Sequence, residues 1–251
     1  MLDIYLVRHG QTQWNLEKRL QGSTDNALND TGRRQAQELG QKLTGVPFAH
    51  IYSSGLRRAQ ETAAAFAGPA PVTALPALNE RSFGKFEGIF EDDRDAARFA
   101  EFGKRGSVLD DSLDGGESLQ SQADRVKAAV AQITARHRSG NIAIVAHGGV
   151  NPLVLAALLD LPVAEATARI KQANDEVYLV RLRGGQAPRC GSRSCAARWN
   201  SSEPSAGAKT PRRRAARGRG IIAPQPARAH PPSAFCPCPP RLCACWPSSR
   251  R

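Results

Sequence analysis

The segment LVRHGQTQWN (residues 6–15) begins with the apolar pair Leu6-Val7 and turns polar at Arg8, just before His9. The segment IAIVAHGG (residues 142–149) repeats this change and turns polar at His147. Short apolar runs that end at glycine are typical of buried strands followed by tight loops. Each segment therefore predicts a strand with a histidine just beyond its carboxyl end.

Strand-like and helix-like patterns alternate along the first 185 residues. Strands are expected at residues 4–7, 50–53, 142–145 and 177–182, and helices at residues 29–43, 56–67, 117–137 and 152–159. Asn29 or Thr31 can cap the first of these helices. This alternation predicts a three-layer α/β fold, with a mostly parallel sheet and helices on both faces.

Residues 84–115 fit the alternation less clearly. Residues 89–104 are charged and weakly periodic, and the turn-rich sequence DDSLDGG (residues 110–116) follows them. We interpret this segment as either a helical insert or a mobile lid.

Charge and cysteine divide the chain after residue 185. Residues 186–251 hold 13 of the 35 basic residues but one of the 23 acidic residues, so they carry the entire net charge of +12. All six cysteines and 11 of the 17 prolines also lie there. We therefore expect one neutral catalytic domain at residues 1–185, without cysteine chemistry, followed by a basic, Pro- and Cys-rich tail at residues 186–251.

The tail shows no hydrophobic period and is expected to be disordered. Its arginine cluster at residues 212–219 could bind nucleic acid through phosphate contacts. An inert or out-of-frame extension is the favoured interpretation, because the domain already looks complete at Leu182. The C-x-C pairs lack the C-x₂-C spacing of zinc sites, so no zinc is expected.

No apolar stretch is long enough to span a bilayer, and the N-terminus lacks the pattern of a signal peptide. The expected location is the cytoplasm, and membrane association is not expected. The sequence predicts no oligomeric state.

Polar residues at the expected strand ends indicate the chemistry. In open parallel sheets, ligands bind beyond the carboxyl ends of the strands, so His9 and His147 are expected to share one crevice. Arg8 is adjacent to the first histidine, and Arg58 follows the strand at residues 50–53. Guanidinium groups match phosphate oxygens, so the expected ligand is a phosphorylated anion. His50 and His137 are expected to be structural.

Six blocks resemble, in order, the motifs of the histidine phosphatase superfamily, the phosphoglycerate mutase-like proteins. The blocks are LVRHGQTQWN (6–15), LQG (20–22), YSSGLRRAQETA (52–63), LNERSFGKFEG (78–88), GGES (115–118) and VAHGG (145–149). The resemblance covers nearly all of residues 1–182 and implies the phosphoglycerate mutase-like fold. Gly55 and Phe86 depart from it, because the family often has Asp and Trp there.

The resemblance implies a role for each matching residue. His9 would be the nucleophile that becomes phosphohistidine, and Glu80 would be the general acid and base. A protonated His147 would complete the catalytic group. The remaining phosphate-binding residues would be Arg8, Asn15, Gln21, Gly22, Arg58 and Gly148. Positive charge and in-line positioning suffice for phosphoryl transfer, so no metal and no cofactor are expected.

Two other carboxylates need separate interpretations. Glu87 lies seven residues after Glu80 and is the rival proton donor; otherwise it would pair with Arg81 or Lys85 in its loop. Glu117 follows two glycines and is expected to stabilise a helix N-terminus.

The length between motifs favours the phosphatase branch. By resemblance, a cofactor-dependent mutase has a longer insert between the Glu80 and Glu117 blocks, which are 37 residues apart here. We therefore predict hydrolysis of small phosphate monoesters, with phosphoglycerate mutase activity as the alternative. α-Ribazole phosphate, sugar phosphates and phosphoglycerate are all compatible substrates.

Overall fold

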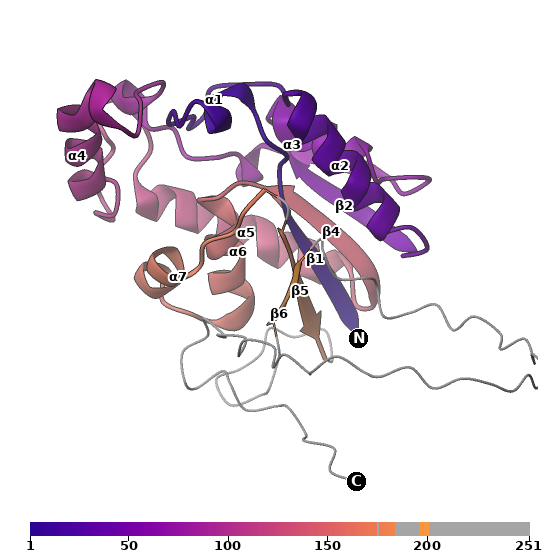
Figure 1. Ribbon diagram of the computed structural model, residues 1–251. Coiled ribbons are helices and arrows are strands. Elements are labelled where there is room, and N and C mark those ends of the chain that lie inside the picture. Colours follow the sequence, from indigo (N-terminus) through magenta and orange to yellow (C-terminus); the bar gives the residue numbers. More distant parts are fainter. Residues whose placement is uncertain (175, 184–195, 201–251) are drawn as a thin grey trace, which may run out of the picture. The chain divides into compact units, whose positions relative to one another are not determined.

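The computed structural model describes residues 1–174, 176–183 and 196–200. One six-stranded sheet, in the order β3-β2-β4-β1-β5-β6, forms the centre of this part of the chain (Figure 1). The strands are β1 (Leu2–Arg8), β2 (Phe48–Ser54), β3 (Val72–Leu75), β4 (Gly140–Ala146), β5 (Glu176–Leu182) and β6 (Ala196–Asn200). The four strands from β3 to β1 pair in parallel, and β5 and β6 pair antiparallel. The expected mostly parallel sheet is confirmed.

The helices lie where periodicity is strongest in the sequence. They are α1 (Gln13–Leu16), α2 (Asp30–Lys42), α3 (Arg57–Ala64), α4 (Ala96–Arg105), α5 (Leu119–Arg136), α6 (Val150–Leu159) and α7 (Val163–Arg169). Three short 3-10 turns are η1 (Pro76–Leu78), η2 (Gly84–Phe86) and η3 (Asp93–Asp95). The four expected helices correspond to α2, α3, α5 and α6. The sequence analysis missed α1, β3 and α7, which are too short to show a clear period.

Helices cover both faces of the sheet (Figure 1). On one face, α5 and α6 pack against alternate residues of β1 and β4, including Ile4 and Ile144. On the other face, α2 and α3 pack against the intervening residues, including Val7 and Val145. Each fully buried aliphatic side chain contributes roughly 1.5–3 kcal/mol, so this core fixes β1 and β4 side by side.

Two helix starts follow from local side-chain chemistry. The Asn29 side chain accepts a hydrogen bond from the Gly32 amide at 2.8 Å, which makes Asn29 the N-cap of α2. The Ser118 side chain caps α5 in the same way through the Ser121 amide. Both caps satisfy amides that the helix cannot pair internally.

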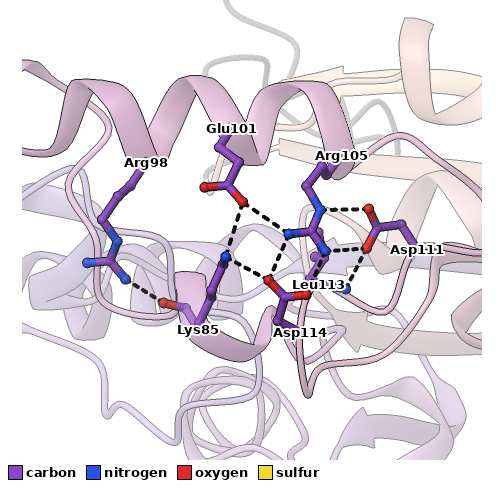
Figure 2. A network of polar contacts seen from close by, with 7 residues as sticks. All are labelled: Lys85, Arg98, Glu101, Arg105, Asp111, Leu113 and Asp114. Atoms are coloured by element: carbon purple, nitrogen blue, oxygen red, sulfur yellow. Dashed lines mark hydrogen bonds and ion pairs between the residues drawn. The ribbon is translucent and has the colours of Figure 1, made fainter.

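The segment after β3 is a helical insert rather than an irregular loop. Helix α4 packs through Phe99 and Phe102 against a small cluster that contains Phe86 and Leu113. Figure 2 shows the polar side of this insert, where Arg105 binds both Asp111 and Asp114.

The ion pairs of the insert extend back toward η2. Lys85 contacts Glu101 at 3.1 Å and Asp114 at 2.6 Å, and Arg98 donates to the Lys85 carbonyl (Figure 2). These pairs are solvent-exposed and add little each, so the aromatic contacts of α4 supply most of its attachment.

Strand β6 lies within the segment for which the sequence predicts no regular structure. It pairs antiparallel with β5 from Glu176 opposite Asn200 to Val180 opposite Ala196. The rest of the expected tail, including its arginine cluster and C-x-C pairs, lies outside the described residues.

Candidate active site

The two predicted histidines lie at the carboxyl ends of neighbouring parallel strands. Arg8 is paired with Ala146 in the β1–β4 register, so the chain leaves both strands at the same level. The ring centroids of His9 and His147 are 5.1 Å apart, and both side chains are buried. The structure therefore brings the two histidines into one site, as the strand ends predicted.

Backbone carbonyl groups orient the two predicted arginines. Arg58, on α3, donates to the carbonyl oxygens of Gly22 at 2.8 Å and Thr24 at 2.7 Å. Arg8 donates to the carbonyl oxygen of Gln172 at 2.5 Å. Neutral carbonyls hold these guanidinium groups in place without cancelling their charge.

Nearby carboxylates, Glu80 among them, favour the charge of these arginines without contacting them directly. Neither Arg8 nor Arg58 forms an ion pair with a carboxylate within the described residues, and the buried Nε of each has no hydrogen-bond partner there. Burial lowers the pKa of both groups, because removal from water disfavours the charged form. Two desolvated cations with unused donors favour the binding of an anion.

His9 is held in the form that a nucleophile needs. Its Nδ1 lies 2.8 Å from the Gly10 carbonyl oxygen, and only a protonated Nδ1 can donate to that acceptor. The lone pair of the neutral ring is then on Nε2. Burial and the charges of Arg58 and Arg8 place the pKa of His9 well below its usual value.

The groups around His147 set the charge state of its free ring. Burial, followed by the positive charge of Arg58, places the pKa of His147 well below its usual value, so these protein groups favour the neutral ring. A bound dianion would act in the opposite sense, because it favours the imidazolium form. Protonation of His147 in the presence of a phosphoryl group stays a prediction.

Glu80 lies within the same site, against the loop that carries His147. Its Oε2 accepts a hydrogen bond from the Gly149 amide at 2.9 Å, and its Oε1 accepts from the Gln122 side chain at 2.9 Å and from the Arg81 amide at 3.0 Å. The side chain is buried to 9 % exposure. These contacts join η1, α5 and the loop after β4 at a single carboxyl group.

Glu87, the rival proton donor, is held by its own loop and by the segment after Gly22. Its two oxygens accept hydrogen bonds from Ser23, Thr24 and the Phe83 amide. These donors lower its pKa although burial alone would raise it. The expected partners Arg81 and Lys85 are wrong, because loop hydroxyl and amide groups occupy the carboxylate instead.

Of the remaining predicted phosphate-site residues, Gly22 contacts Arg58 and Gly148 contacts Arg8, whereas the side chains of Asn15 and Gln21 contact Thr12. The side-chain oxygens of Asn15 and Gln21 both accept hydrogen bonds from Thr12, which orients both amides. Gly22 has φ of 54° and packs so closely against Glu87 that a Cβ would overlap the carboxylate. At Gly148, a Cβ would lie 3.4 Å from the Arg8 guanidinium carbon, so this residue covers Arg8.

Sequence reasoning missed several buried polar residues that support the site. Gln172 binds Arg8 through its carbonyl, and its side chain donates to the Leu6 carbonyl at 3.0 Å. Asn174 donates to the carbonyl oxygen of His9. No motif precedes β5 in the sequence, so no local signal indicated this support.

Two further missed residues lie beside His147. Ser54, at the end of β2, is 2.7 Å from His147 Nε2, and Asn79 accepts hydrogen bonds from Ser54 and Gly55. Ser54 could have been found, because it occupies a strand end inside the motif YSSGLRRA. Asn79 fills the space beside Gly55. The family often has an Asp at the position of Gly55.

Structural roles are expected for His50, His137 and Glu117, and the structure shows the contacts of all three. His50 bonds the Thr73 hydroxyl and His137 bonds the Tyr52 hydroxyl, near the amino end of β2 and away from the site. Glu117 pairs with Arg125 through two hydrogen bonds of 2.6 and 2.7 Å. Ser118 caps α5, and Glu117 lies directly before this cap, where its carboxylate also accepts a hydrogen bond from the Ser121 hydroxyl.

Within the described residues, no cluster of three or more His, Cys, Asp or Glu side chains is arranged to hold a metal ion. In the same part of the chain, no helix is both long and apolar enough to cross a membrane.

A parallel sheet that presents two histidines, two unpaired arginines and a carboxyl group at one edge defines an enzyme of phosphoryl chemistry. The family comparison agrees, since residues 4–190 match the histidine phosphatase superfamily (branch 1). The chain belongs to this superfamily, and it is a phosphoric monoester hydrolase by class.

Named relatives include both mutase-like and phosphatase proteins. The chain is 38% identical over 190 residues to phosphoglycerate mutase-like protein 4 of Arabidopsis thaliana, covering 73% of this chain and 80% of that protein. It is 34% identical over 192 residues to the probable phosphoglycerate mutase GpmB of Salmonella choleraesuis, covering 74% and 87%.

Two solved structures share the fold. The first is a putative α-ribazole-5′-P phosphatase of Escherichia coli, with a TM-score of 0.68, 27% identity and coverage of 79% of this chain and 96% of that one. The second is a mycobacterial glucosyl-3-phosphoglycerate phosphatase, with a TM-score of 0.68, 29% identity and coverage of 80% and 99%.

Proposed function

We propose that this protein is a metal-independent phosphatase that hydrolyses small phosphate monoesters through a phosphohistidine on His9. The observation that carries the proposal is the pairing of the His9 imidazole with two buried guanidinium groups, each of which has an Nε without a hydrogen-bond partner among the described residues. The imidazole is the nucleophile, and the two guanidinium groups attract the phosphoryl group that the imidazole attacks.

In the first step, His9 Nε2 attacks phosphorus in line with the ester oxygen. The N–P bond forms as the P–O bond to the leaving group breaks, and Glu80 gives its proton to the departing alkoxide. Arg8, Arg58 and His147 stabilise the charge on the equatorial oxygens. The carboxylic acid is needed because an alkoxide is a poor leaving group unless it is protonated.

In the second step, water attacks the phosphohistidine. Glu80, now a carboxylate, takes a proton from the water as the new O–P bond forms and the N–P bond breaks. Inorganic phosphate leaves, and His9 and Glu80 return to their starting protonation states. One residue can serve as acid and then base because hydrolysis reverses the direction of proton transfer.

The other phosphate contacts in this proposal come from Asn15, Gln21, Gly22 and Gly148. Asn15 and Gln21 can donate through their amide NH₂ groups, because Thr12 already occupies their carbonyl oxygens. Gly22 and Gly148 can donate through backbone amides, which approach an anion closely when no Cβ intervenes.

Phosphoglycerate mutase activity is the second candidate, favoured by the names of the two curated relatives. A mutase must shield its phosphohistidine from water while the substrate reorients. The insert between η2 and α5 contains one ten-residue helix, α4, which packs on Phe83 and Phe86 and is tied to Asp114 by an ion pair. This modest covering supports hydrolysis over transfer to a second substrate hydroxyl.

A panel of phosphate monoesters, assayed with and without 2,3-bisphosphoglycerate, separates the two functions. The panel contains p-nitrophenyl phosphate, α-ribazole phosphate, sugar phosphates and 3-phosphoglycerate. Release of inorganic phosphate without the bisphosphate supports a phosphatase. Isomerised phosphoglycerate that forms only with the bisphosphate would replace this proposal with the mutase.

The proposal also covers the cellular location of the enzyme and the ligand that it binds. It places the enzyme in the cytoplasm, with a small phosphorylated metabolite as its partner, and assigns it no bound cofactor and no nucleic-acid ligand.

A further inference from the structure

A buried chain of polar groups leads away from the second histidine of the site. His147 Nε2 lies 2.7 Å from Ser54 Oγ, and Ser54 Oγ lies 3.0 Å from Asn79 Oδ1. Ser54 and His147 are both 0% exposed, so water cannot replace these contacts. The chain joins the end of β2 to η1 and the loop after β4.

The positions of the protons in this chain follow from its fixed donors. The Gly55 amide donates to Asn79 at 2.7 Å, so the Asn79 atom at that position must be the oxygen. This oxygen carries no hydrogen, and Ser54 must therefore donate its hydroxyl proton to it. The Leu56 amide also donates to Ser54 Oγ at 3.0 Å. Ser54 can therefore only accept from His147, which places the proton of neutral His147 on Nε2.

The other nitrogen of His147 is the one that an anion can use. His147 Nδ1 is buried and has no hydrogen-bond partner within the described residues. In the neutral ring just described, Nδ1 carries a lone pair, which repels a phosphoryl oxygen. We propose that Ser54 and Asn79 hold the neutral His147 in this form, so that binding of a tetrahedral oxyanion requires uptake of one proton at His147 Nδ1.

The surroundings of His147 fit this coupling. Arg8 and His9 face it from β1, Arg58 from α3 and Arg125 from α5, while Glu80 binds the Gly149 amide beside it. Burial and the cations oppose a charge on the ring, in that order of effect. A bound dianion offsets both effects, so protonation and anion binding favour each other. Ser54 and Asn79 are positioning residues that act through His147.

Calorimetry with tungstate measures the proton directly. Tungstate at about pH 8 is a tetrahedral dianion with no proton of its own to release, and an unperturbed imidazole is neutral there. The binding enthalpy is measured in buffers that differ in ionisation enthalpy. For the full chain, its slope against buffer ionisation enthalpy is expected to show uptake of about one proton per site.

Matched serine variants locate the cause of this uptake. In Ser54→Ala, His147 Nε2 loses its acceptor, so the neutral ring can carry its proton on Nδ1 and donate to the anion. Uptake is then expected to fall to less than about half a proton. Ser54→Thr keeps the hydroxyl and should keep the uptake. Ser53→Ala is the control, because Ser53 is equally buried on the same strand and its hydroxyl has no partner within the described residues.

The form of the free histidine is a second, independent readout. Nitrogen-15 NMR of histidine-labelled protein should show His147 protonated on Nε2 without tungstate and on both nitrogens with it. His147→Gln assigns the signal, and the measurement holds even if Ser54→Ala does not fold.

This inference rests on the proposed phosphate pocket, and the outcomes separate the two. Tungstate binding without proton uptake would overturn the inference and leave the pocket standing. An Nδ1-protonated free ring, or equal uptake in Ser54→Ala and the original chain, would overturn it as well. Failure of tungstate to bind would contradict the pocket itself, and the inference with it.

Discussion

The rings of His9 and His147 are 5.1 Å apart at the ends of β1 and β4, and each has a different hydrogen-bond partner. His9 Nδ1 faces the Gly10 carbonyl, whereas His147 Nε2 faces the Ser54 hydroxyl. The same residue type therefore exposes Nε2 at one position and Nδ1 at the other. In the proposed mechanism, this difference separates the nucleophile from the group that contacts phosphoryl oxygens.

Replacement of His9 by alanine should abolish phosphatase activity. Without the imidazole there is no phosphohistidine, and we expect hydrolysis of p-nitrophenyl phosphate to fall by about three orders of magnitude or more. Circular dichroism should show an unchanged fold. His50→Ala is the matched control at the far end of β2, and undiminished turnover by the His9 variant would exclude the proposed nucleophile.

Replacement of Glu80 by glutamine should matter most for poor leaving groups. Glutamine keeps the size of the side chain but cannot donate the proton that an alkoxide needs, and its NH₂ group loses one of the hydrogen bonds that the carboxyl oxygens accept. We expect alkyl phosphate hydrolysis to fall by roughly 10²–10⁴-fold, and p-nitrophenyl phosphate hydrolysis to fall much less, because p-nitrophenolate leaves without protonation.

Glu87→Gln provides the comparison for this experiment. Because Glu87 holds Ser23, Thr24 and Phe83, this change should raise KM or lower stability for all substrates alike. A leaving-group dependence that appears in the Glu87 variant and not in the Glu80 variant would reverse the assignment.

The free energy of unfolding should fall as the pH is lowered from about 7.5 to about 5. His9 and His147 have pKa values well below 6.5 in the folded protein, so the unfolded chain binds more protons in this range. Their contribution to stability is complete above the unfolded pKa and is lost as the pH falls below it. Each buried histidine adds up to about 1.4 kcal/mol per pH unit.

Urea denaturation at several pH values measures this slope. His147→Asn should flatten it, whereas His137→Asn should change it less, because His137 is only half-buried while His147 is fully buried. A steeper slope in the His147 variant would contradict the proposed burial of a neutral ring.

Replacement of Arg105 by glutamine should loosen helix α4 without unfolding the domain. Arg105 binds Asp111 and Asp114, and the backbone of Leu113 and Asp114 has positive φ values of 57° and 53°. Because solvent reaches and screens these ion pairs, we expect only a small loss of global stability. Hydrogen exchange should accelerate in α4 and in residues 111–114.

The same change tests what holds the insert. Phe102→Ala removes the aromatic contacts with Phe83 and Phe86 and should destabilise the insert more than Arg105→Gln does. A larger destabilisation by Arg105→Gln than by Phe102→Ala would show that the ion pairs hold the insert more strongly than the aromatic contacts do.

Truncation after residue 204 should leave phosphatase activity unchanged, because every proposed site residue precedes β5. Truncation after residue 185 also removes β6, which exposes the paired edge of β5 and should lower the melting temperature. Either truncation should remove any salt-sensitive binding of DNA, measured by fluorescence anisotropy. A loss of activity in the shorter deletion would place part of residues 205–251 in the catalytic unit.

Much of the fold could be predicted from the sequence, because its main strands and helices show local patterns of apolar residues. β1 and β4 are short apolar runs that end at glycine, and α5 repeats its apolar residues with a helical period. Short elements such as α7 carry too few residues for a period. The insert around α4 was ambiguous because its stability comes from aromatic and ionic contacts with residues that follow it.

The sequence by itself determined which strand ends carry reactive side chains, because a residue's place after an apolar run is a local property. His9, Arg58 and His147 could be named in this way. Only the tertiary structure decided the protonation and the partners of the site residues. Ser54 contacts His147, the Gln172 carbonyl accepts a hydrogen bond from Arg8, and Glu87 accepts a hydrogen bond from Ser23. The pKa of a buried group depends on solvent exclusion and on charges from distant parts of the chain, and these exist only once the chain has folded.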